Sequence, residues 1–217
     1  MTVVVATANP GKLGEIRALL GDLPLDARST ADVLGAPLGV AETGDTFEQN
    51  AVQKARAVAE ATHMLTIADD SGLEVDALGG RPGVRSARFA GEGATDADNN
   101  ALLLELLQDV EEGHRTARFR CTVALCDPWD PQNDTVVEGR CEGTIARSPS
   151  GLGGFGYDPL FVVASVGRTM AELGLEEKNA LSHRARALSA LRPKLEQVLA
   201  HRLGEAAQAL GAARAGR

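Results

Sequence analysis

Apolar residues follow two spacings along the first part of the chain. Residues 2–6 form a short, nearly continuous apolar run, which is typical of a buried strand. Apolar residues over 13–20 then recur at helical spacing, behind Asn9, a favourable N-cap, and Pro10, which helices tolerate at their first position. The pattern therefore predicts a strand followed at once by a helix that ends near Gly21.

Start signals predict three later helices. Thr46 opens a capping box ahead of an apolar stripe, and Thr95 stands in the same relation to Asp98 ahead of a leucine-rich segment. Ser182 is the expected N-cap of a last helix, whose leucines also recur at helical spacing. Few bulky apolar residues follow in 204–217, so we expect a frayed tail there.

Alternation with a period of two predicts the remaining strands. Residues 115–127 and 135–147 both alternate, and the polar, proline-bearing stretch between them indicates a long antiparallel hairpin. Residues 64–68 are expected to form a short buried strand that the polar residues 69–72 end, and residues 160–164 a further short strand. Strands with intervening helices, then a hairpin and a closing helix, predict an α/β protein with a mixed sheet.

The composition is that of an ordinary globular protein. The 217 residues are 44% apolar and 24% charged, and this length suits one domain or two lobes that share a core. A net charge of −8 argues against a general nucleic-acid binder, because such proteins normally carry a basic excess. A small anionic ligand is not excluded, since a few well-placed cations can hold one.

The sequence favours a cytoplasmic protein without membrane contact. Its first residues show no basic segment followed by a long apolar run, and no stretch approaches the roughly 18 apolar residues of a membrane helix. Cys121, Cys126 and Cys141 show neither CxxC spacing nor an even count, so we interpret them as small buried residues. We therefore expect no membrane partner and no nucleic-acid partner.

The first segment that suggests chemistry is the strand-to-helix turn Thr7-Ala8-Asn9-Pro10-Gly11-Lys12. The N-terminus of a helix presents free N–H groups and a partial positive charge, so it binds phosphate readily, and Lys12 adds a full charge. The segment lacks the GxxxxGK[ST] pattern of a Walker A loop. An ordinary capped helix is the alternative interpretation.

Two adjacent carboxylates, Asp69 and Asp70, follow the predicted strand over 64–68. They cannot lie in a core without partners, because burial of unpaired charge is costly. Their oxygens suit Mg²⁺, which usually takes one or two carboxylates together with substrate phosphates. Glu42 is a candidate for a second metal-binding carboxylate, and a polar turn over 69–72 is the alternative interpretation.

Two later clusters suggest recognition of a flat, charged ligand. Four glycines within 151–159 permit close approach of the backbone, and Phe155 and Tyr157 offer ring faces to a base. His183 and Arg184 begin the predicted last helix, where two potential cations are unfavourable unless a ligand compensates them. A flexible turn and a solvated charged face are the respective alternatives.

These segments, in this order and spacing, resemble the inosine triphosphate pyrophosphatase family, the non-standard purine nucleoside-triphosphate pyrophosphatases. The resemblance covers residues 3 to about 199, and the ordered set is specific although each motif alone is weak. The motifs are Thr7-Ala8-Asn9-Pro10-Gly11-Lys12, Glu42-Thr43-Gly44, Phe47-Glu48-Gln49-Asn50-Ala51, Lys54-Ala55, Ala68-Asp69-Asp70-Ser71-Gly72-Leu73, Leu78-Gly79-Gly80-Arg81-Pro82-Gly83, Ser86-Ala87-Arg88-Phe89, Gly153-Gly154-Phe155-Gly156-Tyr157-Asp158-Pro159 and Ser182-His183-Arg184.

The resemblance implies an elongated mixed β-sheet flanked by helices, with two lobes around a central nucleotide cleft. We expect residues 1–203 to form this single two-lobed domain, and the protein to pair as a homodimer. The implied reaction is Mg²⁺-dependent hydrolysis of ITP, dITP and XTP to the monophosphate and pyrophosphate.

The resemblance also assigns roles to residues. Asp70 would act as general base, and Glu42 and Asp70 would hold Mg²⁺, with Asp69 beside them as their partner. The residues expected to bind substrate are Thr7, Ala8, Asn9, Pro10, Gly11, Lys12, Lys54, Ser71, Phe155, Gly156, Tyr157, Asp158, Lys178, His183 and Arg184.

One position departs from the family pattern. The first motif of the family usually carries glycine where this chain has Ala8, and alanine resists positive φ, so substrate binding would weaken if the position requires one. The main alternative function is a non-catalytic nucleotide-binding or sensing module on the same fold, against which the three carboxylates argue. A pyrophosphatase for other odd nucleotides, such as modified pyrimidine triphosphates, is the alternative among enzymes.

Overall fold

The computed structural model describes the backbone of residues 1–215 and the side chains of residues 1–204 and 208. The described strands form one six-stranded sheet in the order β2-β1-β3-β4-β5-β6. β1 pairs in parallel with β2 and β3, whereas β3 to β6 pair antiparallel, which confirms the predicted mixed sheet. The strands are β1 Thr2–Val5, β2 Asp26–Ser29, β3 Thr66–Val75, β4 Thr116–Cys126, β5 Thr135–Ile145 and β6 Phe161–Val163.

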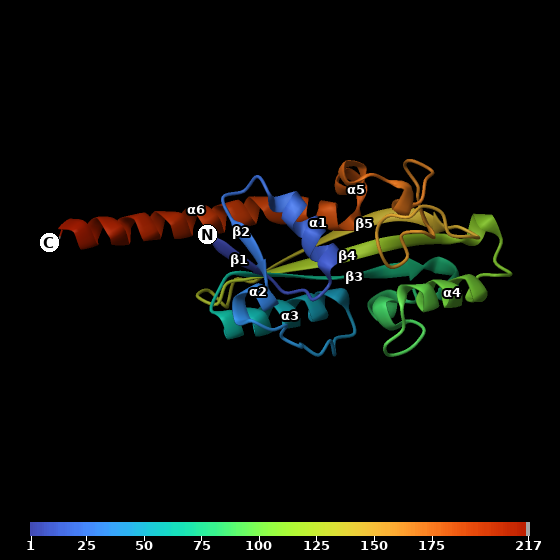
Figure 1. The fold of residues 1–217 in the computed structure, drawn as a ribbon, viewed down its shortest axis with the longest axis horizontal. Coiled ribbons are helices and arrows are strands. Elements are labelled where there is room, and N and C mark those ends of the chain that lie inside the picture. The colour runs from blue at the N-terminus through green and yellow to red at the C-terminus, as the bar shows by residue number, and fades with distance from the viewer. Residues whose placement is uncertain (216–217) are drawn as a thin grey trace.

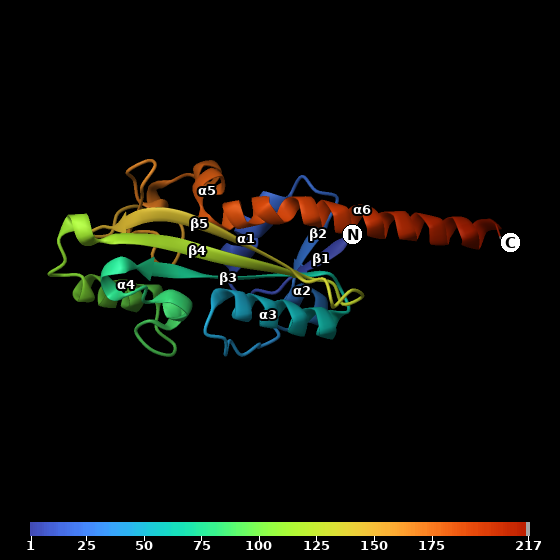
Figure 2. The ribbon, with the colours of Figure 1, turned by 180° about the vertical axis from the view of Figure 1, so that it is seen from behind.

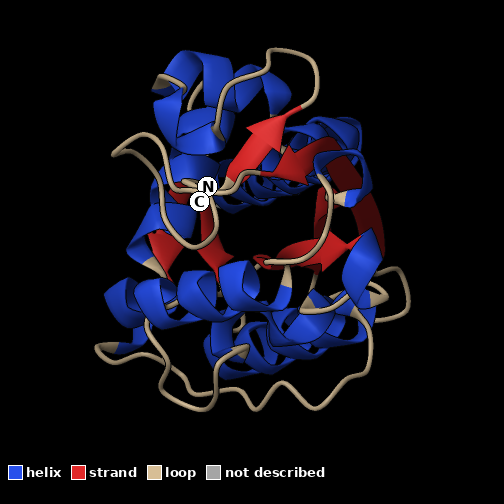
Figure 3. Cartoon of the chain, turned by 90° about the vertical axis from the view of Figure 1, so that its right-hand side faces the viewer, coloured by secondary structure: helices blue, strands red, loops and turns tan. Residues whose placement is uncertain are grey.

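Helices cover both faces of the sheet. They are α1 Pro10–Leu20, α2 Thr30–Leu34, α3 Phe47–Thr62, α4 Asp96–Leu106, α5 Leu175–Leu181 and α6 His183–Ala215. α1, α5 and α6 lie on one side and α2, α3 and α4 on the other (Figure 1), and the reverse view shows the same two layers (Figure 2). Seen from the end, the strands curl between the helical layers (Figure 3).

Helix starts and the hairpin follow the sequence closely, because N-caps and alternation are local signals. Asn9, Thr46, Thr95 and Ser182 each accept a hydrogen bond from a backbone N–H of the helix that follows. β4 and β5 pair antiparallel along their full length, as predicted.

The sequence pattern does not predict β2 and α2. β2 offers a single buried apolar side chain, Ala27, and α2 is only five residues long. A capping box between Ser29 and Asp32 nevertheless marks the start of α2, and this signal is visible in the sequence.

Among the described residues, three buried clusters mark out two lobes. In one lobe, α1 and α6 pack on the sheet around Ile16 and Leu191, and α3 packs on the opposite face around Ala55. In the other lobe, a third cluster gathers α4 and the far ends of β3 to β6 around Leu103 and Phe161. The long strands β3, β4 and β5 each carry residues of both lobes, so these three strands connect the lobes.

The boundary between the lobes crosses β3 at residues 69–72. Ile67 and Ala68 belong to the clusters of the first lobe and Leu73 to the cluster of the second. The prediction that the strand ends at Ala68 is wrong, since β3 runs on to Val75 and pairs with β4 throughout. Carboxylates remain inside this strand because they find cationic partners, described below.

The last helix continues past the buried part of the chain. The backbone of residues 204–215 is helical, and α6 extends beyond the sheet (Figures 1 and 2). Residues 216–217 lie outside the described residues, so the frayed tail stays a prediction. Along the described residues, none of the helices combines the length and apolar character that a bilayer span requires.

Candidate active site

Two adjoining cavities lie where the sheet passes between the lobes. The α1 cavity, of about 340 Å³, opens at the N-terminus of α1. The Phe155 cavity, of about 160 Å³, lies beside the glycine-rich loop that carries Phe155. Asn9, Lys12 and Glu42 line both cavities, so the two form one cleft.

Most of the predicted site residues line this cleft. Those at the α1 cavity are Thr7, Ala8, Asn9, Lys12, Glu42 and Lys54. Those at the Phe155 cavity are Asp70, Ser71, Phe155, Gly156, Tyr157, Asp158, Lys178, His183 and Arg184. Pro10 and Gly11 form the first turn of α1, and Asp69 is buried against Lys12. The fold therefore brings the four sequence clusters together.

The turn before α1 is ordered by its own side chains. Asn9 Oδ1 accepts hydrogen bonds from the N–H groups of Gly11 at 2.8 Å and Lys12 at 3.1 Å, and Thr7 Oγ1 accepts one from the N–H of Asn9. These two helix N–H groups are therefore already paired. Positive potential in the α1 cavity comes from the Lys12 ammonium and the end of the helix dipole.

Ala8 fits this turn without strain. Among the described residues other than glycine, His63 alone has a positive φ. Alanine at position 8 therefore meets none of the conformational cost that a left-handed backbone would impose.

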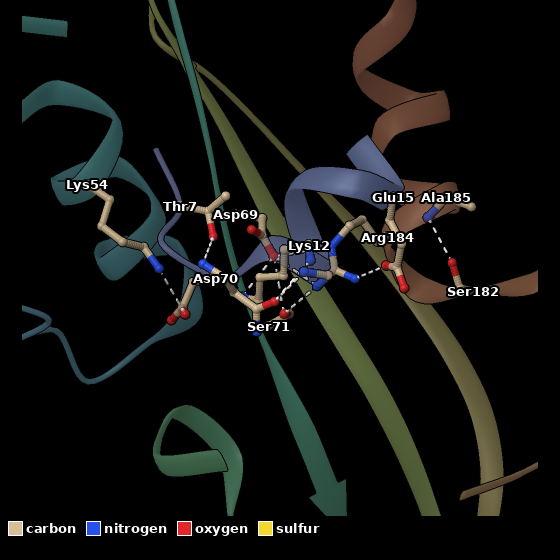
Figure 4. Close-up of polar contacts among 12 residues, drawn as sticks. Thr7, Lys12, Glu15, Lys54, Asp69, Asp70, Ser71, Ser182, Arg184 and Ala185 are labelled. Carbon is tan, nitrogen blue, oxygen red and sulfur yellow. Dashed lines mark hydrogen bonds and ion pairs between the residues drawn. The ribbon is translucent and has the colours of Figure 1, made fainter. Parts of the chain in front are cut away.

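Asp69 and Asp70 contact different elements. Lys12 Nζ lies 3.0 Å and Arg184 Nη2 3.1 Å from Asp69 Oδ2. Asn50 Nδ2 donates to Asp70 Oδ2 at 3.1 Å, and Lys54 Nζ lies 3.3 Å from Asp70 Oδ1. Figure 4 shows Lys54 of α3 contacting Asp70 from one side, while Lys12 and Arg184 contact Asp69 from the other side.

These partners shift the two pKa values in opposite directions. Burial raises the pKa of Asp70, and the lowering effect of Lys54 does not offset it. Burial alone would raise the pKa of Asp69 too, but Lys12 and Arg184 hold it well below the ordinary value. Asp70, which lines the cleft, is therefore the carboxylate suited to proton transfer.

Lys54 joins two carboxylates at the cleft. Its Nζ lies 2.7 Å from Glu42 Oε1 as well as 3.3 Å from Asp70 Oδ1. Burial would lower the pKa of Lys54, but Asp70, Asp69 and Glu42 raise it, so Lys54 is an ammonium at neutral pH. Within the described part of the chain, no three His, Cys, Asp or Glu side chains gather to form a metal cage.

Glu15, on α1, is a charged residue of the site that the sequence reasoning misses. Its carboxylate lies 2.6 Å from Lys178 Nζ and also pairs with Arg184. Glu15 stands four residues before Leu19, so it lies on the face of α1 that the apolar residues predict to be buried. A charged residue on a buried face is the sequence signal that could have identified Glu15 as part of the site. The cation Arg184 at the start of α6 is therefore compensated by Glu15 and Asp69 of the protein itself.

His183 is held neutral. Its ring stacks on Phe119 with centroids 4.7 Å apart, and burial together with Arg184 lowers its pKa well below the ordinary value. Its Nδ1 is buried without a hydrogen-bond partner among the described residues. A neutral imidazole with an unpaired nitrogen thus lines the Phe155 cavity.

The two aromatic residues of the glycine loop differ in position. The Phe155 ring lies 5.0 Å from Lys178 Nζ and 5.9 Å from the Arg184 guanidinium, in cation–π contact with both. The Tyr157 ring belongs to the buried cluster of the second lobe, and its hydroxyl donates to the Ser86 carbonyl at 2.9 Å. Phe155 is therefore the more accessible aromatic surface of the cleft.

Comparison with known proteins gives matches over nearly the whole chain. The model of the Ham1 family matches residues 3–194. The dITP/XTP pyrophosphatase of Geobacter sulfurreducens is 53% identical over 193 residues, which cover 89% of this chain and 96% of that relative. The dITP/XTP pyrophosphatase of Bacillus subtilis is 49% identical over 193 residues, with the same coverage of 89% and 96%.

Solved structures agree with this fold. The Staphylococcus aureus Ham1 protein matches with a TM-score of 0.79 and 38% identity, over 91% of this chain and 99% of that one. A nucleoside-triphosphatase, or dITP/XTP pyrophosphatase, from Mycobacterium abscessus matches with a TM-score of 0.70 and 48% identity, over 89% and 100%. The family resemblance and the ITPase-like α/β fold predicted from the motifs are both confirmed, and the chain belongs to the Ham1 family.

Proposed function

We propose that this protein hydrolyses the non-standard purine nucleoside triphosphates ITP, dITP and XTP to the monophosphate and pyrophosphate, and so removes them from the nucleotide pool. The observation that carries this proposal is the cleft itself, which joins a lysine-lined cavity at a helix N-terminus to a cavity beside an aromatic ring. The relatives named dITP/XTP pyrophosphatase support the same substrate class.

The α1 cavity suits the triphosphate. Lys12 and Lys54 both line it, and the dipole of α1 points its positive end there. These fixed positive charges offset the negative charge that develops on the departing pyrophosphate. Thr7 and Asn9 keep the turn in the shape that presents Lys12.

Asp70 is the proposed general base. Its carboxylate takes a proton from the attacking water as the water oxygen bonds to the α-phosphorus and the bond from that phosphorus to the pyrophosphate oxygen breaks. A raised pKa brings a carboxylate closer to neutral pH, where a general base is most effective. Asn50, whose amide donates to Asp70, keeps the carboxylate oriented.

The carboxylates of the cleft fit Mg²⁺ bound jointly with a substrate. Mg²⁺ prefers oxygen ligands and usually combines one or two carboxylates with phosphate oxygens. Glu42 and Asp70 are the proposed ligands, and their shared contact with the Lys54 ammonium indicates that positive charge is favoured between them. When bound, Mg²⁺ supplies neutralisation of charge on the phosphates. Asp69 fixes Lys12 from the opposite face of the sheet.

The Phe155 cavity suits a 6-oxo purine. The Phe155 ring offers a stacking surface, and Ser71, Asp158 and Lys178 line the cavity around it. Arg184 is the proposed donor toward the purine O6. Asp69, Ser71 and Glu15 accept from four of its five guanidinium N–H groups, and the remaining one, on Nη1, is the proposed donor. An amino group in place of O6 would leave such a donor unpaired, which is a strong basis for rejection of ATP.

The proposal extends to the protein as a whole. Residues 1–203 act as one two-lobed catalytic domain with 204–217 as its tail, and the protein works in the cytoplasm as a homodimer. Light scattering coupled to gel filtration tests the dimer. The measured mass should be about twice the 22.6 kDa of the single chain, whereas a monomer would give 22.6 kDa.

The test of function is pyrophosphate release from ITP, XTP, dITP, ATP and GTP, with Mg²⁺ and with EDTA, beside an Asp70→Asn variant. We expect pyrophosphate from ITP, dITP and XTP, little from ATP and GTP, and loss of activity in EDTA and in the variant. Tight binding of ITP without turnover would instead favour the non-catalytic sensor. Release of inorganic phosphate instead of pyrophosphate would show that water does not attack the α-phosphorus, and would contradict the proposed reaction.

A further inference from the structure

Two side chains of α4 hold the loop that carries Phe155. The N–H of Gly156 donates to Asp96 Oδ2 at 2.7 Å, and the Asn100 amide donates to the Gly156 carbonyl at 2.9 Å. Asp96 and Asn100 are four residues apart, so they lie on one face of the helix. Both backbone polar groups of Gly156 are therefore fixed by a single distant element, and we call these two contacts the α4 clamp.

The helix that supplies the clamp is firmly anchored. Leu103 of α4 is fully buried in the core of the second lobe. Asn99 accepts a hydrogen bond from the Ala90 N–H at 2.8 Å and donates to the Ala87 carbonyl at 3.2 Å. The α4 clamp therefore holds the loop at a fixed position relative to a helix that is itself anchored in the core.

The loop needs such outside support. Gly154 and Gly156 flank Phe155, and both have a positive φ, of 76° and 62°. Their missing side chains leave this backbone free to turn unless hydrogen bonds hold it. Asp158 Oδ2 accepts from the Phe155 N–H at 3.1 Å and from Lys178 at 2.8 Å. The α4 clamp is the matching constraint on Gly156, the next residue of the loop.

The Phe155 ring also has little room to move toward α1. A Cβ atom added at Gly11 would lie 2.8 Å from the edge of this ring, so the ring already rests against the first turn of α1. A small rotation about Gly156 would therefore move the ring relative to Arg184 and the rest of the cavity. The position of the ring depends on contacts that reach across both lobes.

We propose that Asp96 and Asn100 are positioning residues that set base selectivity. By holding both polar groups of Gly156, they fix where Phe155 presents its face to the purine. Asp96 itself lines the Phe155 cavity and Asn100 does not, so Asn100→Ala tests positioning through the loop alone. This inference rests on the proposed function, since it concerns discrimination between purine triphosphates by that same cleft.

Four variants test it: Asp96→Ala, Asn100→Ala, Asp96→Asn and Asp98→Ala. Asp96→Asn keeps an oxygen that accepts from Gly156. Asp98 closes the capping box of α4 with Thr95, and among the described residues no hydrogen bond or ion pair joins it to the loop. Asp98→Ala is therefore the matched control for a weakened helix end. The measurements are kcat and KM for ITP and ATP, inhibition by pyrophosphate, and the melting temperature.

The two clamp variants to alanine should raise KM for ITP about tenfold, with kcat changed less than about threefold, and should lower the ITP-to-ATP ratio of kcat/KM several-fold. Asp96→Asn should recover most of that ratio. Asp98→Ala should keep it even where its melting temperature falls as far as that of Asp96→Ala. Inhibition by pyrophosphate should stay within about twofold in every variant, because the α1 cavity is untouched.

Two results would overturn the inference alone. One is a wild-type ITP-to-ATP ratio in both Asp96→Ala and Asn100→Ala, and the other is an equal loss of that ratio in Asp98→Ala. Asn100→Ala decides the matter if Asp96→Ala does not fold. A wild-type protein that releases no pyrophosphate from ITP would overturn the proposed function and this inference together.

Discussion

Asp69 and Asp70 are neighbours in β3 whose carboxylates lie on opposite faces of the sheet. Consecutive side chains of a strand alternate in direction, so Asp69 meets Lys12 of α1 and Asp70 meets Lys54 of α3. Asp69 is 1% exposed and Asp70 5%, and their pKa values nevertheless shift in opposite directions. Two adjacent, chemically identical residues are therefore expected to respond differently to the same substitution.

Asp69→Asn should destabilise the fold. The change leaves Lys12 and Arg184 without their shared counter-charge in a buried site, and removal of one partner of a buried ion pair typically costs about 3–5 kcal/mol. Because the pKa of Asp69 is lowered in the folded state, its stabilisation is present at neutral pH and is lost progressively below about pH 5. Urea titrations from pH 3 to 8 should therefore show a difference in the free energy of unfolding between wild type and variant that narrows as the pH falls below about 4. A gap that widens in acid would contradict this assignment.

Asp70→Asn should abolish turnover while the fold is kept. Loss of a general base typically lowers kcat by about 10²–10⁴-fold. The pKa of Asp70 is raised in the folded state, so its ionised form is disfavoured there and its contribution to stability falls as pH rises through that pKa. The neutral amide does not carry this cost, and the melting temperature at pH 8 should equal or exceed that of the wild type. A large drop in melting temperature would show that the carboxylate is structural, as we assign to Asp69.

Much of the fold could be predicted because its signals are local. Asn9 before Pro10 fixes the start of α1 within a few residues, and the Thr95–Asp98 box does the same for α4. The end of β3 differs from the prediction because Asp69 resembles a strand terminator in sequence, whereas its partner Arg184 is 115 positions away. Local polarity does not reveal a charge that is neutralised by distant residues.

The candidate site shows the same limit. The motifs identify Lys12, Lys54 and Arg184, yet not that Glu15 pairs with Arg184 or that Asp96 holds Gly156. These contacts join residues on separate elements, so only the packed fold defines them. Sequence motifs gave the residues of the cleft, and the tertiary structure gave the residues that orient them.

Gly139→Ala should disturb the start of α6. A Cβ atom at Gly139 of β5 would lie 2.2 Å from the His183 carbonyl oxygen and 2.4 Å from the Ala187 nitrogen, so the helix would have to move off the strand. Overpacking of this kind typically costs about 1–3 kcal/mol. Gly14→Ala, in α1, is the control: its Cβ meets no atom within 4 Å, and alanine in a helix should stabilise by about 0.5–1 kcal/mol. Opposite shifts in melting temperature are expected, and a neutral Gly139→Ala would show that α6 tolerates displacement.

Arg184→Ala and Arg184→Lys should both narrow the preference for ITP over ATP. Arg184 is 1% exposed and bonds Asp69, Glu15 and Ser71, so the alanine variant also leaves buried carboxylates under-compensated and should lose stability. Lysine keeps the charge but lacks the planar, multi-donor fork, so it should keep more stability than alanine without restoring selectivity.

Selectivity can be separated from stability because both substrates are assayed on one preparation. A loss of folded protein lowers the two values of kcat/KM by the same factor, and their ratio is unaffected. A hydrogen bond to a charged group is worth about 1.5–3 kcal/mol, so the ITP-to-ATP ratio should fall by roughly 10- to 100-fold. Arg192→Ala is the control on the same helix, since Arg192 contacts only Asp22 and Glu196 among the described pairings at the surface. An unchanged ratio in Arg184→Lys and Arg184→Ala would remove Arg184 from purine recognition and leave it as the buried partner of Asp69 and Glu15.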